Sequence, residues 1–339
     1  MRILYIGHNF GTSYHRYQAL KRLGHDTFLV NPYWFMPSNR WTAKWIFETG
    51  GWGLATWIKI AVLKVVRNMH FDFVLVDGGE LIGPELLKSL KTRFKCVTNY
   101  NHDDPFSPRY YRKWRLYRRS IPEYDLLTVV RDKNVNEVKS FGGKRVLRVF
   151  MSADEFVHKQ PLQVSSEDIA AWSSEVVFVG TWMPERGRFM VRLLQHSIPL
   201  SIWGDRWHKA REWRFIERVW RGPSVDGHDY VKIIQTSKIC LGLLSKENRD
   251  LHTTRSVEIP AAKGLLCAQR TREHLAMYIE NQEAVFWKDA DECARVCHKL
   301  LKAPSQRLTI AQRGHERCLK NNYFHEPTLS LLIKRATEK

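Results

Sequence analysis

The segment RDLHTTRSVEIPAAKG, residues 249–264, brings one cation and two carboxylates close to a loop-to-helix junction. Arg255 stands three residues before Glu258, and seven residues separate Asp250 from Glu258. A helix start has unsatisfied backbone N–H groups, which suit a phosphate. An ionised carboxylate accepts hydrogen bonds from two sugar hydroxyls. A phosphate beside a sugar describes a nucleotide-sugar; the alternative is a surface loop that leads into a core helix.

Two loops in the first half follow apolar runs that we interpret as buried strands. The loop Gly7 to Gly11 contains His8, and its glycines let the backbone turn tightly near a ligand. His102 and Asp103 follow the run FKCVTNYN. Ligands of parallel sheets bind at the carboxyl ends of the strands, and a His beside carboxylates can act as base or orienter. Plain turns are the alternative for both loops, and a pair of aspartates can also hold Mg²⁺.

A third loop has the composition of a phosphate site. The run EVVFVG ends in Gly180, and Arg186 follows near the start of the next predicted helix. Backbone donors from a loop together with a cation suit a diphosphate. Arg188 is the weaker candidate, because we expect it on the helix surface. No acidic residue ends the second strand, where Asn31 stands, and this argues against a nicotinamide enzyme.

Apolar runs that alternate with helical patterns predict the elements that position these loops. In the first half, strands are expected at residues 2–7, 26–32, 71–79, 94–101, 125–131 and 144–150, and helices at 14–23, 43–69 and 84–91. In the second half, strands are expected at 175–180, 199–204, 238–244, 264–269 and 283–288, and helices at 186–195, 230–237, 256–263, 290–302, 305–320 and 328–336. Two doubly wound α/β domains follow, joined by a polar linker at 153–166.

The composition of the 339 residues is that of a globular protein, with 44% hydrophobic and 26% charged residues. No apolar run reaches the roughly 20 residues of a membrane span, and the N-terminus lacks the pattern of a signal peptide. We therefore expect a cytoplasmic protein. The six cysteines lack the spacing of a zinc or redox knuckle, and we expect Cys293 and Cys297 to be buried apolar residues.

The net charge of +19 is concentrated in the first half. Residues 1–160 contain 26 Lys and Arg against 14 Asp and Glu. The densest run is RYYRKWRLYRR, from Arg109 to Arg119, in which aromatic residues separate six cations. Such a run suits an anionic membrane surface or a nucleic-acid groove, and a solvated helix face is the alternative.

These motifs resemble those of GT-B glycosyltransferases, and most of all the CgeB-like (spore-maturation) group, related to family 4. The resemblance implies two Rossmann-like domains facing across a cleft, with a last helix that crosses back to the first domain. It assigns Glu258 to the donor ribose and Asp250, one methylene shorter than the family's Glu, to the donor sugar. Gly180 and Arg186 would contact the diphosphate with Arg255. GT-B enzymes usually need no metal, so we expect neither metal nor cofactor.

The combined hypothesis is a transfer of a sugar from a nucleoside diphosphate sugar to a hydroxyl of a glycan, lipid-linked or other acceptor. Residues 1–160 would bind the acceptor, 161–322 the nucleotide-sugar, and 323–339 would form the returning helix. His102, Asp103 and Asp250 are the candidate catalytic residues, and Gly7, His8 and Gly11 form the acceptor loop. Arg109–Arg119 would contact an anionic membrane. A nucleotide-sugar epimerase and a basic nucleic-acid-binding protein stay open as alternatives, although the Arg255–Glu258 motif has no purpose in the second.

Overall fold

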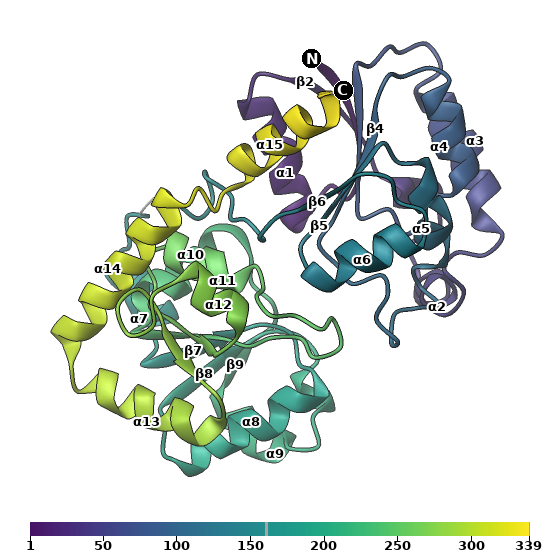
Figure 1. The fold of residues 1–339 in the computed structure, drawn as a ribbon. Coiled ribbons are helices and arrows are strands. Elements are labelled where there is room, and N and C mark those ends of the chain that lie inside the picture. The colour runs from purple at the N-terminus through teal and green to yellow at the C-terminus, as the bar shows by residue number, and fades with distance from the viewer. Residues whose placement is uncertain (160–161, 339) are drawn as a thin grey trace. The chain divides into compact units, whose positions relative to one another are not determined.

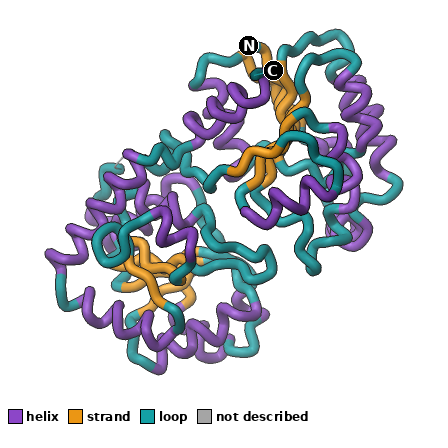
Figure 2. The backbone as a smooth tube through the Cα atoms, in the orientation of Figure 1, coloured by secondary structure: helices purple, strands orange, loops and turns teal. Residues whose placement is uncertain are grey.

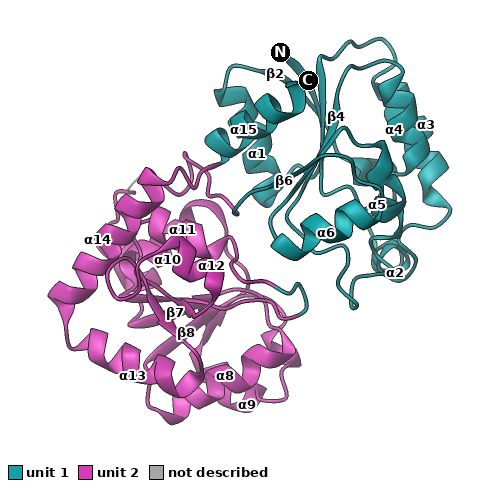
Figure 3. Ribbon diagram, viewed as in Figure 1, with its two compact units in different colours: residues 1–150, 247–249, 325–339 teal, residues 151–246, 250–324 magenta. Residues whose placement is uncertain are grey.

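The computed structural model describes residues 1–159 and 162–338, in which the chain forms two compact α/β units. Unit 1 comprises residues 1–150, 247–249 and 325–339, and unit 2 comprises 151–246 and 250–324 (Figure 3). In each unit a six-stranded parallel sheet lies between helices, which Figure 2 shows in purple around the orange strands. The predicted fold class is thereby found twice in one chain.

The sheet of unit 1 has the strand order β2-β1-β3-β4-β5-β6, and every neighbouring pair is parallel. Figure 1 labels β2, β4, β5 and β6 of this sheet. Its strands are β1 (Arg2–Ile6), β2 (Asp26–Val30), β3 (Phe73–Asp77), β4 (Val97–Asn101), β5 (Leu126–Val129) and β6 (Val146–Arg148). The order reverses between β1 and β3. Ligands of doubly wound sheets bind outside the carboxyl ends of the strands at such a switch point.

The helices of unit 1 cover both faces of this sheet and bury apolar side chains against it. They are α1 (Gly11–Arg22), α2 (Arg40–Thr49), α3 (Leu54–Val65), α4 (Pro84–Lys91), α5 (Arg115–Ser120), α6 (Asp132–Ser140) and α15 (His325–Thr337). In α4, a proline occupies the first turn and two lysines the last, as helix termini favour. The last helix, α15, packs against α1, as the predicted return of the chain requires.

The sheet of unit 2 has the order β12-β11-β10-β7-β8-β9, so its switch point lies between β7 and β10. Its strands are β7 (Val176–Val179), β8 (Leu200–Trp203), β9 (Trp220–Gly222), β10 (Ile239–Gly242), β11 (Leu266–Gln269) and β12 (Val285–Trp287). Its helices are α7 (Ser166–Trp172), α8 (Pro184–Gln195), α9 (Trp213–Ile216), α10 (Gly227–Thr236), α11 (Arg255–Ala261), α12 (Arg272–Met277), α13 (Ala290–Leu301) and α14 (Pro304–Lys320).

The structure differs from the sequence-based expectations mainly in short elements. Strand β9 and helices α5, α6, α7, α9 and α12 are additional to those predicted. The proposed boundary between residues 160 and 161 lies outside the described residues. Residues 151–159, which we assigned to the first domain, belong to unit 2. Within the described part of the chain, no helix combines the length and the apolarity needed to cross a bilayer.

Candidate functional site

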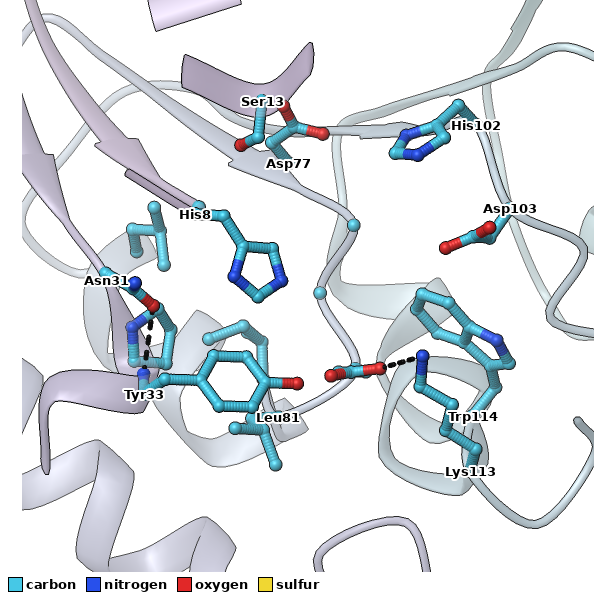
Figure 4. Close-up of a pocket in the computed structure, with 17 residues that line it drawn as sticks. His8, Ser13, Asn31, Tyr33, Asp77, Leu81, His102, Asp103, Lys113 and Trp114 are labelled. Atoms are coloured by element: carbon cyan, nitrogen blue, oxygen red, sulfur yellow. Dashed lines mark hydrogen bonds and ion pairs between the residues drawn. The ribbon is translucent and has the colours of Figure 1, made fainter. Parts of the chain in front are cut away.

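A pocket in unit 1 opens at the switch point between β1 and β3 (Figure 4). The loop after β1 and the loop after β3 form its two sides, and the loop after β4 closes one end. Polar and aromatic residues line it: His8, Ser13, Asn31, Tyr33, Asp77, Glu80, His102, Asp103, Lys113 and Trp114. The structure thus brings the two loops that the sequence singled out in this half, Gly7–Gly11 and His102–Asp103, to one pocket.

The floor of this pocket contains a buried ion pair between Arg16 of α1 and Asp77 at the end of β3. The guanidinium donates to both carboxylate oxygens, at 2.8 and 2.9 Å, and both side chains are almost fully buried. Tyr5 also donates its hydroxyl to Asp77. Burial by itself would raise the pKa of Asp77, but Arg16 outweighs it and holds that pKa below its ordinary value. Asp77 therefore stays ionised, and the positive charge of Arg16 balances its negative charge.

The loop after β1 needs glycine because it passes close to this ion pair. A Cβ on Gly7 would lie 2.8 Å from Ser13 Oγ and from the Tyr5 ring, closer than real atoms approach. Gly11, with φ +57°, begins α1. Between them the ring of His8 stacks on Tyr33, with ring centroids 4.8 Å apart. The Nδ1 atom of His8 is buried and hydrogen-bonded to no described residue, so it is available to a ligand in the pocket.

His102 and Asp103 both line the pocket, with the Asp103 carboxylate turned into it (Figure 4). Burial lowers the pKa of His102, so the imidazole is neutral at pH 7. Burial would raise the pKa of Asp103, but His102, Lys113 and Arg131 together hold it below its ordinary value. Lys113 also pairs with Glu80 at 2.7 Å inside the pocket. A neutral imidazole beside an ionised carboxylate can accept a proton from a hydroxyl.

The neighbouring carboxylate, Asp104, has a different environment. It is fully buried, and Arg249 donates to its two oxygens at 2.5 and 2.7 Å. Arg249 also donates to Glu137, and Asn134 of α6 donates to Asp104 at 2.9 Å. Asp104 therefore fixes the loop after β4 to α6 and to the short return of the chain at residues 247–249. Of the two aspartates, Asp103 is the one that faces the pocket.

In unit 2, the loops that follow β7 and β10 meet at the switch point around Arg186. This side chain is buried and donates to the carbonyl of Thr181 at 2.7 Å and to those of Leu243 and Leu244 at 3.3 Å. A Cβ on Gly180 would lie 2.8 Å from the Phe178 ring, so the turn after β7 requires glycine. These hydrogen bonds of Arg186 connect the loop after β7 to the loop after β10. Its contact with a diphosphate therefore stays a prediction.

Arg255 and Glu258 form an ion pair at the start of α11. The guanidinium of Arg255 also donates to the carbonyl of Val179 at 3.2 Å and stacks on Tyr230, 4.2 Å from the ring centroid. Burial would lower the pKa of Arg255, but Tyr230 and Glu258 raise it above its ordinary value. The His158 Nε2 lies 3.9 Å from Glu258. The predicted pair is therefore a cation and a carboxylate beside the carboxyl end of β7.

Asp250 lies in the long loop between β10 and α11, nearly buried, with its backbone N–H bonded to the carbonyl of Ser245. Two buried histidines shape the end of this loop. His252 contacts Glu273 and accepts from the backbone N–H of Met151 at 2.9 Å. His274 lies 2.7 Å from Ser256 in α11, and burial lowers its pKa to about 4. This network holds the segment that carries Asp250, Arg255 and Glu258.

The basic run from Arg109 to Arg119 is only partly a surface feature. Lys113 turns into the pocket of unit 1, and Arg118 is buried, donating to the carbonyl of Pro105 at 2.7 Å beneath Tyr111. Arg109 pairs with Glu247. The expectation that all six cations face a membrane is wrong for Lys113 and Arg118, because the chain uses them to build the loop after β4.

Several residues of the pocket were missed by the sequence analysis. Asp77 lies near the end of the predicted strand 71–79 and precedes two glycines, so the rule that selected His102 and Asp103 would also have selected it. Arg16, Tyr33 and Lys113 gave no comparable signal. Arg16 reaches Asp77 from α1, while Tyr33 and Lys113 reach the pocket from the turn after β2 and from the loop after β4.

Comparison with known proteins finds one matching family model and several structures with a similar fold. Residues 185–327 match a family model described as glycosyl transferase-like. A search of curated proteins by sequence finds no match. The fold is similar to that of sucrose-phosphate synthase from Thermosynechococcus elongatus, with a TM-score of 0.72, 11% identity, and coverage of 99% of this chain and 98% of that one.

Two further structures are similar over nearly the whole chain. Anabaena HepE in complex with UDP and glucose has a TM-score of 0.68 and 11% identity, covering 99% of this chain and 100% of that one. A trehalose-6-phosphate synthase, studied for glycosyl transfer with retention, has a TM-score of 0.66 and 14% identity, covering 98% and 99%. The predicted GT-B fold is therefore confirmed.

Proposed function

We propose that the protein transfers a sugar from a nucleoside diphosphate sugar to a hydroxyl group of an acceptor. The observation that carries this proposal is the Arg255–Glu258 pair beside the carboxyl end of β7, at the switch point of unit 2. The match to the glycosyl transferase-like family spans this pair. Structures with the same fold have been determined with UDP, with UDP and glucose, and with UDP-glucose.

In this proposal unit 2 binds the donor. Glu258 accepts hydrogen bonds from the ribose, and Asp250 contacts the donor sugar. Arg255 and the backbone at Gly180 balance the charge that develops on the leaving diphosphate, while Arg186 holds the loops that present them. Preorganised donors aimed at developing charge are usually the largest contribution to such a reaction. The donor is a substrate, and the proposal includes neither a metal nor another cofactor.

The pocket of unit 1 would receive the acceptor, a glycan, a lipid-linked sugar or another hydroxyl compound. Asp103 is the ionised carboxylate that faces this pocket, with His102 neutral beside it. In an inverting transfer Asp103 or His102 would take the proton of the hydroxyl. In a retaining transfer they would orient the donor. The anomeric configuration of the product, measured by NMR, separates the two. Membership of the CgeB-like group and a cytoplasmic location remain parts of the proposal.

The test is donor binding by calorimetry, with UDP, UDP-glucose and the corresponding guanosine and thymidine compounds. Glu258→Gln keeps the shape of the side chain but removes its charge, and we expect donor affinity to fall about 10- to 150-fold, the effect of losing a hydrogen bond to a charged group. Glu283→Gln is the matched control, because Glu283 also pairs with an arginine of unit 2, Arg317. Equal donor affinity in wild type and Glu258→Gln would refute the assignment. Product analysis without an acceptor would reveal an epimerase.

A further inference from the structure

An unusual number of large apolar side chains is exposed between residues 34 and 65, which we call the tryptophan segment. Five of the chain's 13 tryptophans lie in it. Seven of its side chains are between 44 and 65% exposed: Trp34, Trp41, Trp45, Phe47, Trp52, Trp57 and Ile60. Scattered single apolar residues on a surface need no explanation, but a concentration of this kind marks an interaction site.

The segment forms the helices α2 and α3 (Figure 1), and the pattern of buried residues in these helices explains why the seven side chains are exposed. In the ten residues of α2 only Ile46 is buried. Helix α3 buries Ile58 and Val62 in the core of unit 1, which leaves Trp57, Ile60 and Lys64 on its other side. Trp45 and Trp52 lie beside each other across the turn that joins the helices, with ring centroids 6.5 Å apart.

Exposed cations accompany these aromatic side chains. Arg40, Lys44 and Lys64 belong to the segment and are exposed, and Arg40 stacks on Trp41 at 4.7 Å. Trp52 lines a surface hollow with Arg112 and Arg115, two exposed cations of the basic run. Glu48 is the one acidic residue between positions 34 and 65. The chemistry of the surface is therefore aromatic and cationic.

We infer that the tryptophan segment docks unit 1 onto an anionic lipid bilayer. Tryptophan is enriched at the interface of membranes, where an apolar ring with a polar N–H matches the headgroup region. Lysine and arginine beside it attract anionic lipids. No described helix could span the bilayer, so the contact is peripheral. The segment replaces most of the basic run as the membrane surface, and Arg112 and Arg115 are the part of that run that joins it.

The position of the segment connects this surface to the pocket of unit 1. The chain leaves β2 at Asn31, whose side chain accepts from the backbone N–H of Tyr33, and both residues line the pocket. The next residue, Trp34, begins the tryptophan segment. Trp57 of α3 then donates its indole N–H to the carbonyl of Phe35 at 2.8 Å. A bilayer on this segment would lie beside the pocket, and docking itself requires no glycosyl transfer.

The experiment is flotation of the full chain with liposomes of phosphatidylcholine, with and without about one third phosphatidylglycerol, at low and high salt. We expect binding to the anionic vesicles only, weakened by salt. Arg40→Gln/Lys44→Gln/Lys64→Gln should lower the partition coefficient about fivefold per removed charge, or roughly 100-fold together. Trp41→Ala/Trp52→Ala should abolish most of the remaining binding, while circular dichroism shows an unchanged fold.

Matched controls lie in unit 2. Lys299→Gln/Lys302→Gln/Arg313→Gln removes three exposed cations, and Phe156→Ala/Phe215→Ala removes two exposed aromatic rings. Both controls should float like wild type. Equal binding to neutral and anionic vesicles would overturn the inference, as would binding that survives the tryptophan changes. A wild-type dimer in light scattering that the tryptophan variant dissociates would assign the surface to self-association instead.

Discussion

Replacing Asp77 by asparagine should destabilise unit 1 strongly. The side chains of Arg16 and Asp77 are 2% and 1% exposed, and their two hydrogen bonds are 2.8 and 2.9 Å long. Removing one partner of a buried pair leaves an uncompensated charge and costs about 3–5 kcal/mol. At roughly 1.4 kcal/mol per factor of ten, the unfolding equilibrium of unit 1 should shift about 150- to 5000-fold. Asp77→Asn therefore tests the floor of the pocket.

Hydrogen exchange followed by mass spectrometry measures this loss within unit 1, through peptides that cover β1 and β3. Glu85→Gln is the control, because it removes an exposed pair with Lys88 from the same unit and should change nothing measurable. Replacing both partners, Arg16→Met with Asp77→Leu, should recover much of the loss, since apolar pairs of similar volume often replace buried ion pairs without cost. Full protection of β1 and β3 in Asp77→Asn would refute the reasoning.

The stability that Asp77 contributes should also depend on pH. The pKa of Asp77 is lower in the folded than in the unfolded protein, where it has its ordinary value of 3.8. Its contribution is therefore complete above about pH 4 to 5 and is lost as the pH falls through the folded pKa. Wild type should lose its advantage over Asp77→Asn only under acid conditions. A constant difference down to the lowest accessible pH would contradict the assigned charge.

Two further predictions concern the proposed acid–base pair and the cysteines. Asp103→Asn should lower kcat about 10²- to 10⁴-fold and leave donor affinity unchanged, because a general base acts in the transition state. His102→Ala should show a smaller loss of the same kind, and a loss confined to donor affinity would show that neither residue takes part in the chemical step. Cys267, Cys293 and Cys297 have sulfur atoms within 4.8 Å of one another and are buried in the core of unit 2, so a thiol reagent should modify none of them in the native protein and all of them in urea, and rapid native labelling would contradict their burial.

Much of the fold could be predicted because short apolar runs ended by glycine define buried parallel strands. The range 84–91 was predicted to the residue, since Pro84 marks its start and Leu86, Leu87 and Leu90 form its buried face. Helix α6 was missed because its sequence, DKNVNEVKS, buries only Asn134 and Val138 and lacks an apolar stripe. Its partners lie elsewhere in the chain, and Asn134 reaches Asp104 only after folding.

The candidate site could be predicted less completely, because the type of a side chain does not reveal which groups it will hydrogen-bond in the folded protein. Arg186 was assigned to a diphosphate because it is a cation near the start of the helix that follows Gly180, and in the structure it donates to three backbone carbonyls. Arg118 was counted as a surface cation, and it is buried under Tyr111. Asp103 and Asp104 are adjacent in sequence, and only the fold separates a pocket residue from a buried partner of Arg249.

The packing of α15 on α1 sets an order of events during synthesis. The last helix of unit 1, α15, comprises His325–Thr337, and its Leu329 and Leu332 are fully buried. At about 5–20 residues per second, roughly 10 to 35 s pass between the synthesis of residue 150 and that of residue 325. Throughout that interval the surface that receives α15 is open on the ribosome. Unit 2 can complete its core first, and the nascent chain presents a binding site for chaperones until α15 emerges.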